Sequence, residues 1–324
     1  MTSDRLRNLV AAASASPSVH NVQPARWRID GAGLVLLEDR TRRLAVGDPS
    51  GHDAAISLGA AAEGLVLAAG REGLVATVER LPDSGEAMPA IARFSFSPGT
   101  PSDPLAAHLE SRASWRGAFA PPEPADREAA AALTAEDRTV AASPEDIAWL
   151  AAQCDEASYG FMRNGGFRAE LRGWMRLSRG HPDWARDGLN AEAMRLSGVE
   201  ALGAGLVLGP LFRPLAALGL APHLLAERKS FDAAAGVALF HRPSGEDPFE
   251  SGRHFHRCWL ALEAAGFGAN VLAALADDKA IAARIAERFG IGPQRRLVSA
   301  FRFGRRSGSG FPRARLPLSE VLLS

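Results

Sequence analysis

The chain has 324 residues, of which 47% are hydrophobic and 23% are charged. These values are ordinary for a globular protein, and the length allows one large domain or two of ordinary size. Lys plus Arg and Asp plus Glu both number 37, so the composition gives no reason to expect a nucleic acid or an anionic membrane surface as a partner. The two cysteines lie far apart and form neither a disulfide framework nor a metal site, which favours a cytoplasmic location.

The start of the chain predicts an amphipathic helix, with Asp4 as its N-cap and Pro17 as its end. Its apolar run is too short for the core of a signal peptide, and no uninterrupted apolar segment in the sequence is long enough to span a bilayer. The next segment, SPSVHNVQPARW at 16–27, concentrates hydrogen-bonding side chains between two prolines. It leads into a predicted hairpin that turns at Asp30-Gly31.

The rest of the chain alternates predicted helices and strands. We expect a buried helix over 55–74, strands at 75–81 and 92–97, a Pro-, Ser- and Gly-rich boundary at 98–104, helices over 121–133 and from Ser143, several helical pieces over 167–229, a strand at 234–242, helices over 252–266 and 277–290, and a last strand at 295–304. Each half contains a buried helix and then an aromatic-rich strand, ARFSFS in one and SAFRFG in the other. That similarity suggests an internal duplication, although two unrelated Ala-rich helices could produce it.

A second polar segment, RASWRGAF, lies at 112–119. In an extended chain, Arg112, Ser114 and Arg116 point to the same side and would present two guanidinium groups and a hydroxyl to a phosphate. The alternative is that both arginines are solvated surface groups. Spacing alone favours this alternative, because arginine is abundant in the chain and lysine occurs only twice.

Taken together, the two polar segments resemble the nitroreductase superfamily of FMN-dependent oxidoreductases. The family's Arg-Arg-Ser-x-Arg-x-Phe segment is matched at Arg112, Ser114 and Arg116, and its Ser-x-x-Asn-x-Gln-Pro-Trp segment is matched at Ser18, Asn21, Gln23 and Pro24. The resemblance implies that the arginine segment grips the flavin phosphate and that the asparagine reaches the flavin. The C-terminal FRFGRRSGSGFPRARLPLSEVL resembles the family's closing strand and tail, which implies a phosphate contact from Arg315 and, secondarily, from Arg313.

The order of these segments resembles the twin-domain nitroreductases of the mycobacterial Acg type, which carry two nitroreductase-like halves in one polypeptide. DPSGHDAAISLGAA and DPFESGRHFHRCWLALEAAGFGA resemble other recurrent stretches of that group. The resemblance implies an α+β fold of two related halves, each a mostly antiparallel sheet flanked by helices, that together form an internal pseudo-dimer. We expect the halves at 1–100 and 101–324, with a helical insertion at about 165–230 in the second.

The chain also departs from the family pattern. Ala25 stands where the family has Trp, Ala113 replaces an Arg, and an additional residue separates Arg116 from Phe119. No second Asn-x-Gln-Pro follows the arginine segment, which implies one flavin site. The stretch DGLNAEAMRLS at 187–197 is expected to form a helix over or beside the flavin.

Histidines supply the remaining candidate groups. His20 could act as an acid or base beside a flavin or bind its own loop, and its place in the flavin-contacting segment makes it a candidate contact. His254 and His256 do not share a helical face, so they do not indicate a metal site. The start of the predicted helix at Gly252-Arg253 could also assist a phosphate, but a surface arginine explains it better.

The resemblance implies a flavoenzyme that takes hydride from NAD(P)H onto FMN. It would pass electrons to a nitro compound, quinone or similar small-molecule acceptor by ping-pong turnover, without a catalytic side chain of its own. The alternative is an FMN store or redox-stress protein in which a closed lid prevents turnover. Neither function requires a metal, a nucleic acid or a membrane, and the expected assembly is a monomeric pseudo-dimer or a homodimer.

Overall fold

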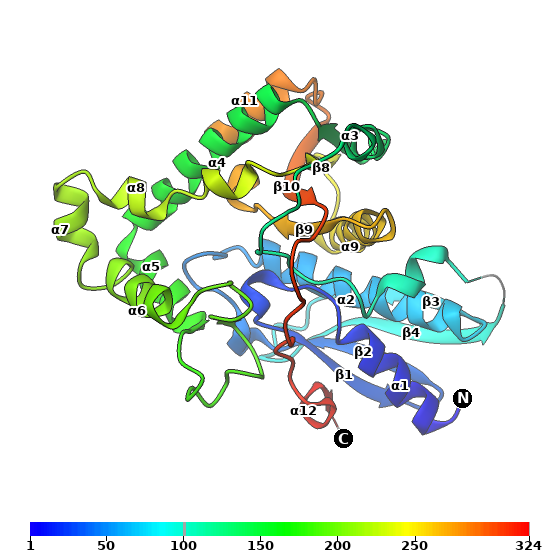
Figure 1. Ribbon diagram of the computed structural model, residues 1–324. Coiled ribbons are helices and arrows are strands. Elements are labelled where there is room, and N and C mark those ends of the chain that lie inside the picture. Colours follow the sequence, from blue (N-terminus) through cyan, green and yellow to red (C-terminus); the bar gives the residue numbers. More distant parts are fainter. Residues whose placement is uncertain (100–101, 324) are drawn as a thin grey trace.

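Two sheets enclose a pair of long helices in the computed structural model, which describes residues 1–99 and 102–323 (Figure 1). The helices are α2 (His52–Arg71) and α9 (Pro248–Ala264), and they pack closely against each other. Strands within each sheet are mostly antiparallel, with further helices around them. The predicted α+β class, with mostly antiparallel sheets flanked by helices, is confirmed.

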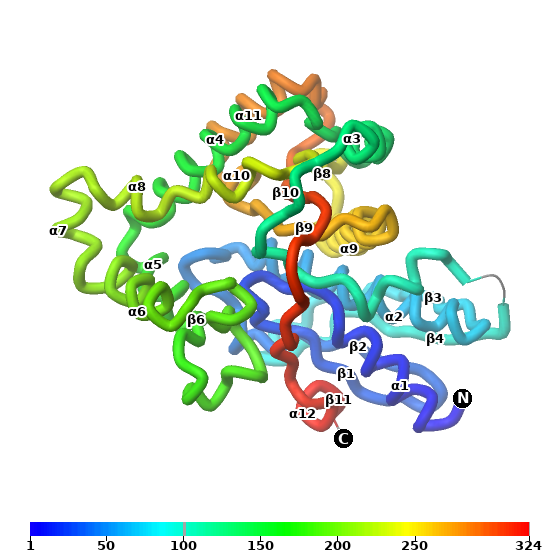
Figure 2. Tube along the Cα trace, in the orientation of Figure 1, coloured from blue at the N-terminus to red at the C-terminus, as the bar shows by residue number. Residues whose placement is uncertain are grey.

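The first sheet has the strand order β11-β1-β2-β4-β3. Its strands are β1 (Ala25–Asp30), β2 (Gly33–Glu38), β3 (Leu74–Arg80), β4 (Ala90–Pro98) and β11 (Leu322–Leu323). The predicted hairpin is confirmed, because Asp30 pairs with Gly33 across a turn in which Gly31 has a φ of +59°. β11 joins parallel to β1, so the C-terminal end of the chain completes the first sheet (Figure 2).

The first helix, α1 (Ser3–Ala13), corrects two details of the sequence prediction. Thr2, not Asp4, is its N-cap, and the Thr2 Oγ1 accepts a hydrogen bond from the Arg5 amide at 3.4 Å. The helix also ends before Pro17, at Ala13. The polar loop is therefore longer than predicted and begins at the end of α1.

The second sheet has the antiparallel order β5-β8-β10-β9. Its strands are β5 (Arg138–Ala141), β8 (Gly236–Pro243), β9 (Gly268–Val271) and β10 (Arg295–Gly304), and the helices around it are α3 (Pro124–Ala131), α4 (Pro144–Arg163), α10 (Ala274–Asp277) and α11 (Lys279–Arg288). The C-terminal α12 (Leu318–Val321) packs instead on β1 and α1, at the first sheet. Ser143 caps α4 as predicted, with its hydroxyl 3.1 Å from the Asp146 amide. The predicted helix over 277–290 is broken because Asp278 caps a new helix there.

A helical insertion lies between α4 and β8, at the left of Figure 1. It comprises α5 (Gly165–Trp174), β6 (Met175–Arg176), β7 (Leu189–Asn190), α6 (Gly198–Val207), α7 (Phe212–Ala217), α8 (Ala221–Leu225) and the 3-10 turn η4 (Arg228–Phe231). The predicted helix over 187–197 is wrong. Asn190 instead caps a turn through the Ala193 amide at 2.7 Å, and Arg195 has a φ of +60°, outside the helical region.

Two glycines permit the close crossing of α2 and α9. A Cβ atom on Gly59 would lie 1.9 Å from the Phe249 carbonyl oxygen, and one on Gly252 would lie 2.2 Å from the Ile56 carbonyl oxygen. Beside this crossing, the buried Glu63 pairs with both Arg253 and Arg257 of α9, each at 2.9 Å. Glycine and a shared carboxylate therefore bring the two halves together.

α2 is long and apolar enough to cross a membrane by length and composition alone, although the sequence reading identified no such segment. Most of its apolar window, 72%, is buried within the protein. The predicted boundary at 98–104 includes residues 100 and 101, which lie outside the described residues. The division into residues 1–100 and 101–324 therefore stays a prediction.

Candidate functional site

The polar loop between α1 and β1 has an unusual backbone. His20, Asn21 and Gln23 have φ angles of 43°, 57° and 52°, in the left-handed region that residues other than glycine seldom adopt. Such conformations persist only where the surrounding structure holds them, and they are concentrated at functional sites. Ser18 supports the turn because its hydroxyl accepts a hydrogen bond from the Gln23 amide at 3.0 Å.

Asn21 links the loop to two distant parts of the chain. Its Nδ2 donates to the carbonyl oxygens of Gly188 in the insertion (3.2 Å) and Ala314 in the C-terminal tail (3.1 Å). Its Oδ1 accepts a hydrogen bond from Arg315 at 2.7 Å. The side chain therefore positions three segments relative to one another, and its hydrogen-bonding groups are engaged within the protein.

Gln23 makes a similar connection while almost fully buried. Its Nε2 donates to the Arg186 carbonyl oxygen at 2.8 Å, and its Oε1 accepts from the Leu316 amide at 3.0 Å. The insertion and the C-terminal tail are thus both anchored on the loop that the sequence singled out.

Three arginines gather behind this loop: Arg112, Arg313 and Arg315. Arg112 is only 2% exposed, stacks on the Trp259 ring at 4.5 Å and donates to the Ala15 carbonyl oxygen at 2.6 Å. Its Nε is buried and has no hydrogen-bond partner among the described residues.

The three guanidinium groups act on one another electrostatically. Burial, with the charges of Arg315 and Arg313, lowers the pKa of Arg112 well below its usual value. Burial and the charge of Arg313 lower the pKa of Arg315 to about 10. Like charges held together at depth are costly, so this cluster favours an anion beside it.

Arg116 belongs to a different group of charges. Burial lowers its pKa, and its charged neighbours are Glu227 of the insertion and Arg302 of β10. Arg116 also adds to burial in lowering the pKa of His20 to about 4, so His20 is neutral near pH 7. Arg112 and Arg116, which the sequence predicted to face one phosphate together, therefore lie among different charges. Half-buried Ser114 lies between them and forms an isolated β-bridge with Ala269.

Two further ionisable groups, the buried Arg302 and the half-buried Asp53, were not predicted from the sequence. Arg302 is 2% exposed, with Nε and one terminal nitrogen unpaired among the described residues, and its guanidinium lies 5.3 Å from the Phe231 ring of η4. Asp53, in the first turn of α2, has its pKa raised to about 8 by burial and by the charges of Asp277 and Asp48. Arg302 is a charged residue between two phenylalanines of the buried strand β10, and this pattern could have identified it from the sequence.

The insertion covers the segment that carries the arginines. Arg195 lies over the Trp115 ring at 4.6 Å and over the Phe311 ring at 5.1 Å. Asp187 pairs with Arg176 at 2.6 Å and also with Arg42, beside the loop. The insertion is therefore packed against the site on two sides.

A small cavity of about 30 Å³ lies beneath the loop and is bordered by Ala25, the position where the family has Trp. The Ser16 hydroxyl and the Trp27 indole nitrogen border it and lack partners among the described residues. This volume accommodates a water molecule, which needs about 10–15 Å³ or more.

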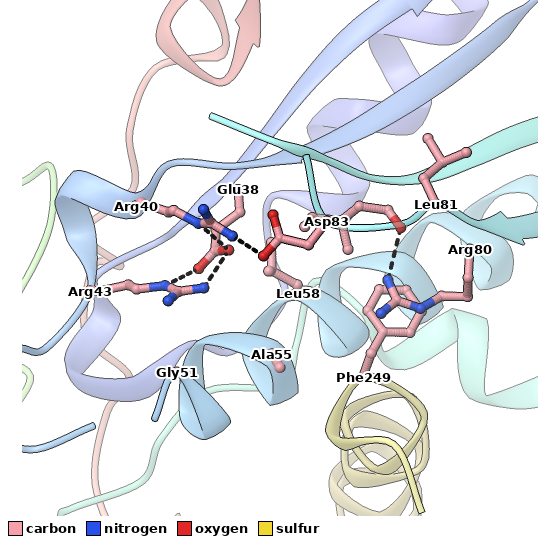
Figure 3. Close-up of a pocket in the computed structure, with 11 residues that line it drawn as sticks. Glu38, Arg40, Arg43, Gly51, Ala55, Leu58, Arg80, Leu81, Asp83 and Phe249 are labelled. Atoms are coloured by element: carbon pink, nitrogen blue, oxygen red, sulfur yellow. Dashed lines mark hydrogen bonds and ion pairs between the residues drawn. The ribbon is translucent and has the colours of Figure 1, made fainter. Parts of the chain in front are cut away.

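A larger cavity, of about 170 Å³, contains none of the predicted site residues (Figure 3). Its arginines are already paired: Arg43 binds Glu38 at 2.5 and 2.8 Å, Arg40 binds Asp83, and Arg80 lies 4.0 Å from the Phe249 ring. Because these charges are satisfied internally, the cavity does not share the electrostatic character of the arginine cluster.

Of the two histidines of α9, His256 lies in the contact with α2. The Nδ1 atom of His256 lies 2.8 Å from the Ala60 carbonyl oxygen, and burial together with the charge of Arg112 lowers its pKa to about 3. Among residues 1–99 and 102–323, no three His, Cys, Asp or Glu side chains are placed to hold a metal ion.

Comparison with known proteins gives partial matches to curated nitroreductases, and no family model matches. The chain is 34% identical over 98 residues to "Putative NAD(P)H nitroreductase acg" of Mycobacterium tuberculosis strain ATCC 25618 / H37Rv, covering 30% of this chain and 29% of that protein. It is 35% identical over 80 residues to "Putative NAD(P)H nitroreductase Rv3131" of the same strain, covering 25% and 23%. The matches thus span less than a third of either relative, and they confirm the resemblance to the nitroreductase superfamily.

Solved structures give more distant likenesses. One is the FMN and NADPH-dependent nitroreductase NfnB from sphigopyxis sp. strain HMH, with a TM-score of 0.35 and 18% identity over 67% of this chain and 96% of that chain. Another is the FMN-dependent nitroreductase NfnB from Mycobacterium smegmatis in complex with NADPH, with a TM-score of 0.32 and 19% identity over 64% and 98%.

Proposed function

We propose that this protein is an FMN-dependent oxidoreductase that takes hydride from NAD(P)H and reduces a small-molecule acceptor such as a nitro compound or a quinone by ping-pong turnover. The partial identity to proteins named as NAD(P)H nitroreductases supports this proposal. We expect it to act in the cytoplasm, a reducing compartment in which the buried Cys154 and Cys258 would stay as free thiols.

The arginine cluster carries the proposal. Arg112 is buried and Arg313 and Arg315 are half-buried, so three positive charges lie close together there. Glu263 acts on both Arg112 and Arg313, and Glu110 acts on Arg313. Arg315 already donates from all three of its nitrogens within the protein, whereas the buried Arg112 Nε has no partner among the described residues. A buried charge without a full set of partners costs several kcal/mol, so a dianion that binds Arg112 and Arg313 beside the charge of Arg315 would gain much of its affinity there. The phosphate of FMN has this charge and accepts bidentate hydrogen bonds from arginine.

The remaining site residues take roles that follow from their contacts. Ser114 and Arg116 continue the extended segment away from the cluster, and His20 lies near Arg116, so these three residues would border the rest of the cofactor. Asn21 and Gln23 would act as positioning residues, because the protein already uses their amides to fix the loop, the insertion and the C-terminal tail. Ser18 would hold the loop turn.

Bound FMN would supply the redox chemistry, accepting hydride from a nicotinamide and passing electrons on. The protein would supply binding, orientation and control of access. The neutral His20 adds no charge to the site, and Arg195 covers the Trp115 ring. A site shielded from water also protects the reduced state from side reactions.

The way the insertion binds the loop favours a second candidate function. Gly188 of the insertion both donates to Asn21 through its amide (3.2 Å) and accepts from it through its carbonyl oxygen (3.2 Å). A cover tied to the site in this way would limit the entry of a nicotinamide. The protein would then be an FMN store or redox-stress protein with little or no turnover.

Anaerobic stopped-flow mixing separates the two functions. If the protein is a reductase, the flavin absorbance near 450 nm bleaches after mixing with NADH or NADPH and returns when a quinone or nitro compound is added. Flavin that stays oxidised with both nucleotides rejects the reductase and leaves the storage function.

The phosphate placement has its own test. Replacing Arg112 and Arg313 by Ala should weaken FMN binding by about 100-fold or more, because truncating buried charged contacts costs about 2–5 kcal/mol. Arg284→Ala is the matched control, since Arg284 pairs with Glu156 and Gln153 on the surface. If both variants retain FMN as the wild type does, the phosphate lies elsewhere.

A further inference from the structure

The outer side of the helical insertion exposes an unusual amount of apolar surface. Of the ten large hydrophobic side chains that are exposed among the described residues, seven lie between positions 199 and 224. We call the exposed side chains of this segment the insertion surface. Its main members are Val199, Leu202, Leu206, Leu218, Leu220 and Leu224.

These side chains are exposed because each helix of the insertion uses only one side for folding. Ala201 of α6, Phe212 of α7 and Ala221 of α8 are buried against the protein. Phe212 is held by the Arg168 guanidinium, 3.7 Å from its ring, and by Tyr159 of α4. Among the described residues nothing covers the exposed side chains on the opposite sides, and Figure 1 shows α7 at the outer edge of the molecule, far from both sheets.

The exposure is substantial at individual positions. Val199 is 83% exposed, Leu218 is 72% exposed and Leu202 is 67% exposed. On α6, Val199, Leu202 and Leu206 follow the spacing of a single helical face.

The size of the insertion surface matches that of a protein interface. Its exposed apolar area, on the order of 600 Å², is at or beyond the upper range usual on a monomer and approaches the roughly 800 Å² that each partner contributes to a standard interface. Singly scattered exposed leucines need no explanation, but seven large exposed apolar side chains between positions 199 and 224 indicate a binding partner.

We propose that the insertion surface is the contact between two copies of this chain, related by a two-fold axis. In such an interface the same patch faces itself, so it must be self-complementary. An apolar patch with few charges meets this requirement, and its charged members Glu200 and Arg213 are of opposite sign. The whole chain has a formal net charge of zero, so two copies do not repel each other.

The charges of the segment argue against a membrane as the occupant. A helix that lies on an anionic membrane carries an excess of Lys and Arg. Residues 197–230 contain Arg213, Arg228 and Lys229 but also Glu200 and Glu227, which leaves an excess of only one cation. The inference rests on the insertion alone and is independent of the proposed redox function.

Sedimentation of the full-length protein over a concentration series tests the proposal. We expect a species of twice the 34.2 kDa chain mass. The double variant Leu202→Glu/Leu218→Glu should weaken association by at least about 100-fold, because each substitution removes an apolar side chain from both sides of a symmetric contact. Both residues are exposed in the single chain, so circular dichroism should show that the variant stays folded.

The matched control is Val75→Glu, which introduces the same charge at a 49% exposed position in β3, outside the insertion. It should associate as the wild type does. A wild type that is monomeric at every concentration, or a double variant that associates normally, overturns the proposal. Binding to phosphatidylglycerol vesicles by a protein that stays monomeric also overturns it.

Cross-linking supplies a second measurement that does not depend on weakening the contact. Both native cysteines are buried, so a cysteine introduced on the insertion surface is the reactive thiol. A two-fold axis brings some residue of the patch close to its own copy, so single cysteines at the six positions above should include at least one that gives a disulfide-linked dimer under mild oxidation. A failure at all six positions contradicts the proposal.

Discussion

Asn21 offers the most direct perturbation of the site. Replacing it by Gly removes two neutral hydrogen bonds, to the carbonyl oxygens of Gly188 and Ala314, and one bond from the charged Arg315. A neutral hydrogen bond contributes about 0.5–1.5 kcal/mol and one to a charged group about 1.5–3 kcal/mol. We therefore expect Asn21→Gly to lower the free energy of unfolding by about 3–4 kcal/mol.

Two companion variants separate the hydrogen bonds from the backbone. Asn21→Ala loses the same bonds and must also adopt a φ of +57°, which costs an alanine about 1–2 kcal/mol more than a glycine. Asn21→Asp keeps an acceptor for Arg315 and loses only the two neutral bonds, so its loss should be about 2 kcal/mol.

Urea unfolding followed by tryptophan fluorescence and circular dichroism measures these differences. The expected order of stability is wild type, Asp, Gly and then Ala. If the Gly variant is as stable as the wild type, the three bonds do not hold the insertion and the tail to the loop. If Ala equals Gly, the positive φ is not required.

Three further predictions concern the helix contact and the loop. Gly59→Ala should destabilise the protein by about 3 kcal/mol or more in urea unfolding, because its Cβ would meet the Phe249 backbone. Gly160→Ala in α4, whose Cβ would have nothing within 4 Å, should stabilise the protein by up to about 1 kcal/mol, and similar effects of the two variants would disprove the close crossing. Glu63→Gln should lower the free energy of unfolding by about 3 kcal/mol, because Arg253 and Arg257 lose their buried partner. Glu156→Gln, at the exposed pair with Arg284, should lower it by less than about 1 kcal/mol, and equal losses would contradict a structural role for Glu63. The pKa of His20 is about 4 in the folded state and 6.5 in the unfolded state, so the unfolded state gains the proton first, and stability should fall as pH drops from about 6.5 to 4. His20→Asn, which tolerates the same φ, should reduce that slope, and an unchanged slope would show that His20 is not buried beside Arg116.

Local signals in the sequence predicted much of the fold. Alternating apolar residues and the Asp30-Gly31 turn predicted β1 and β2, and the run 295–304 coincides with β10. Short elements such as β5 and β9 were missed because four residues carry too little periodicity. Asp278 was read as part of one helix, although an aspartate that can cap the next helix also ends the one before it.

The candidate site was predictable only in its parts. The loop 16–24 and the arginine segment could be recognised from residue type and spacing, but the partners of Asn21 lie 167 and 293 residues further along the chain. No local pattern encodes such contacts. For the same reason the sequence could not show that Arg112 lies near the charge of Arg315, or that Arg116 lies near the charge of Arg302. The family resemblance connected the segments, and the tertiary contacts then determined how their charges are divided.

The absorbance spectrum of the purified protein after incubation with FMN and removal of free flavin tests the central claim most directly. The account predicts a flavin spectrum with about one FMN per chain, released by heat as FMN and lost in the Arg112→Ala/Arg313→Ala variant but retained in Arg284→Ala. A folded, colourless wild-type protein after this treatment would contradict it.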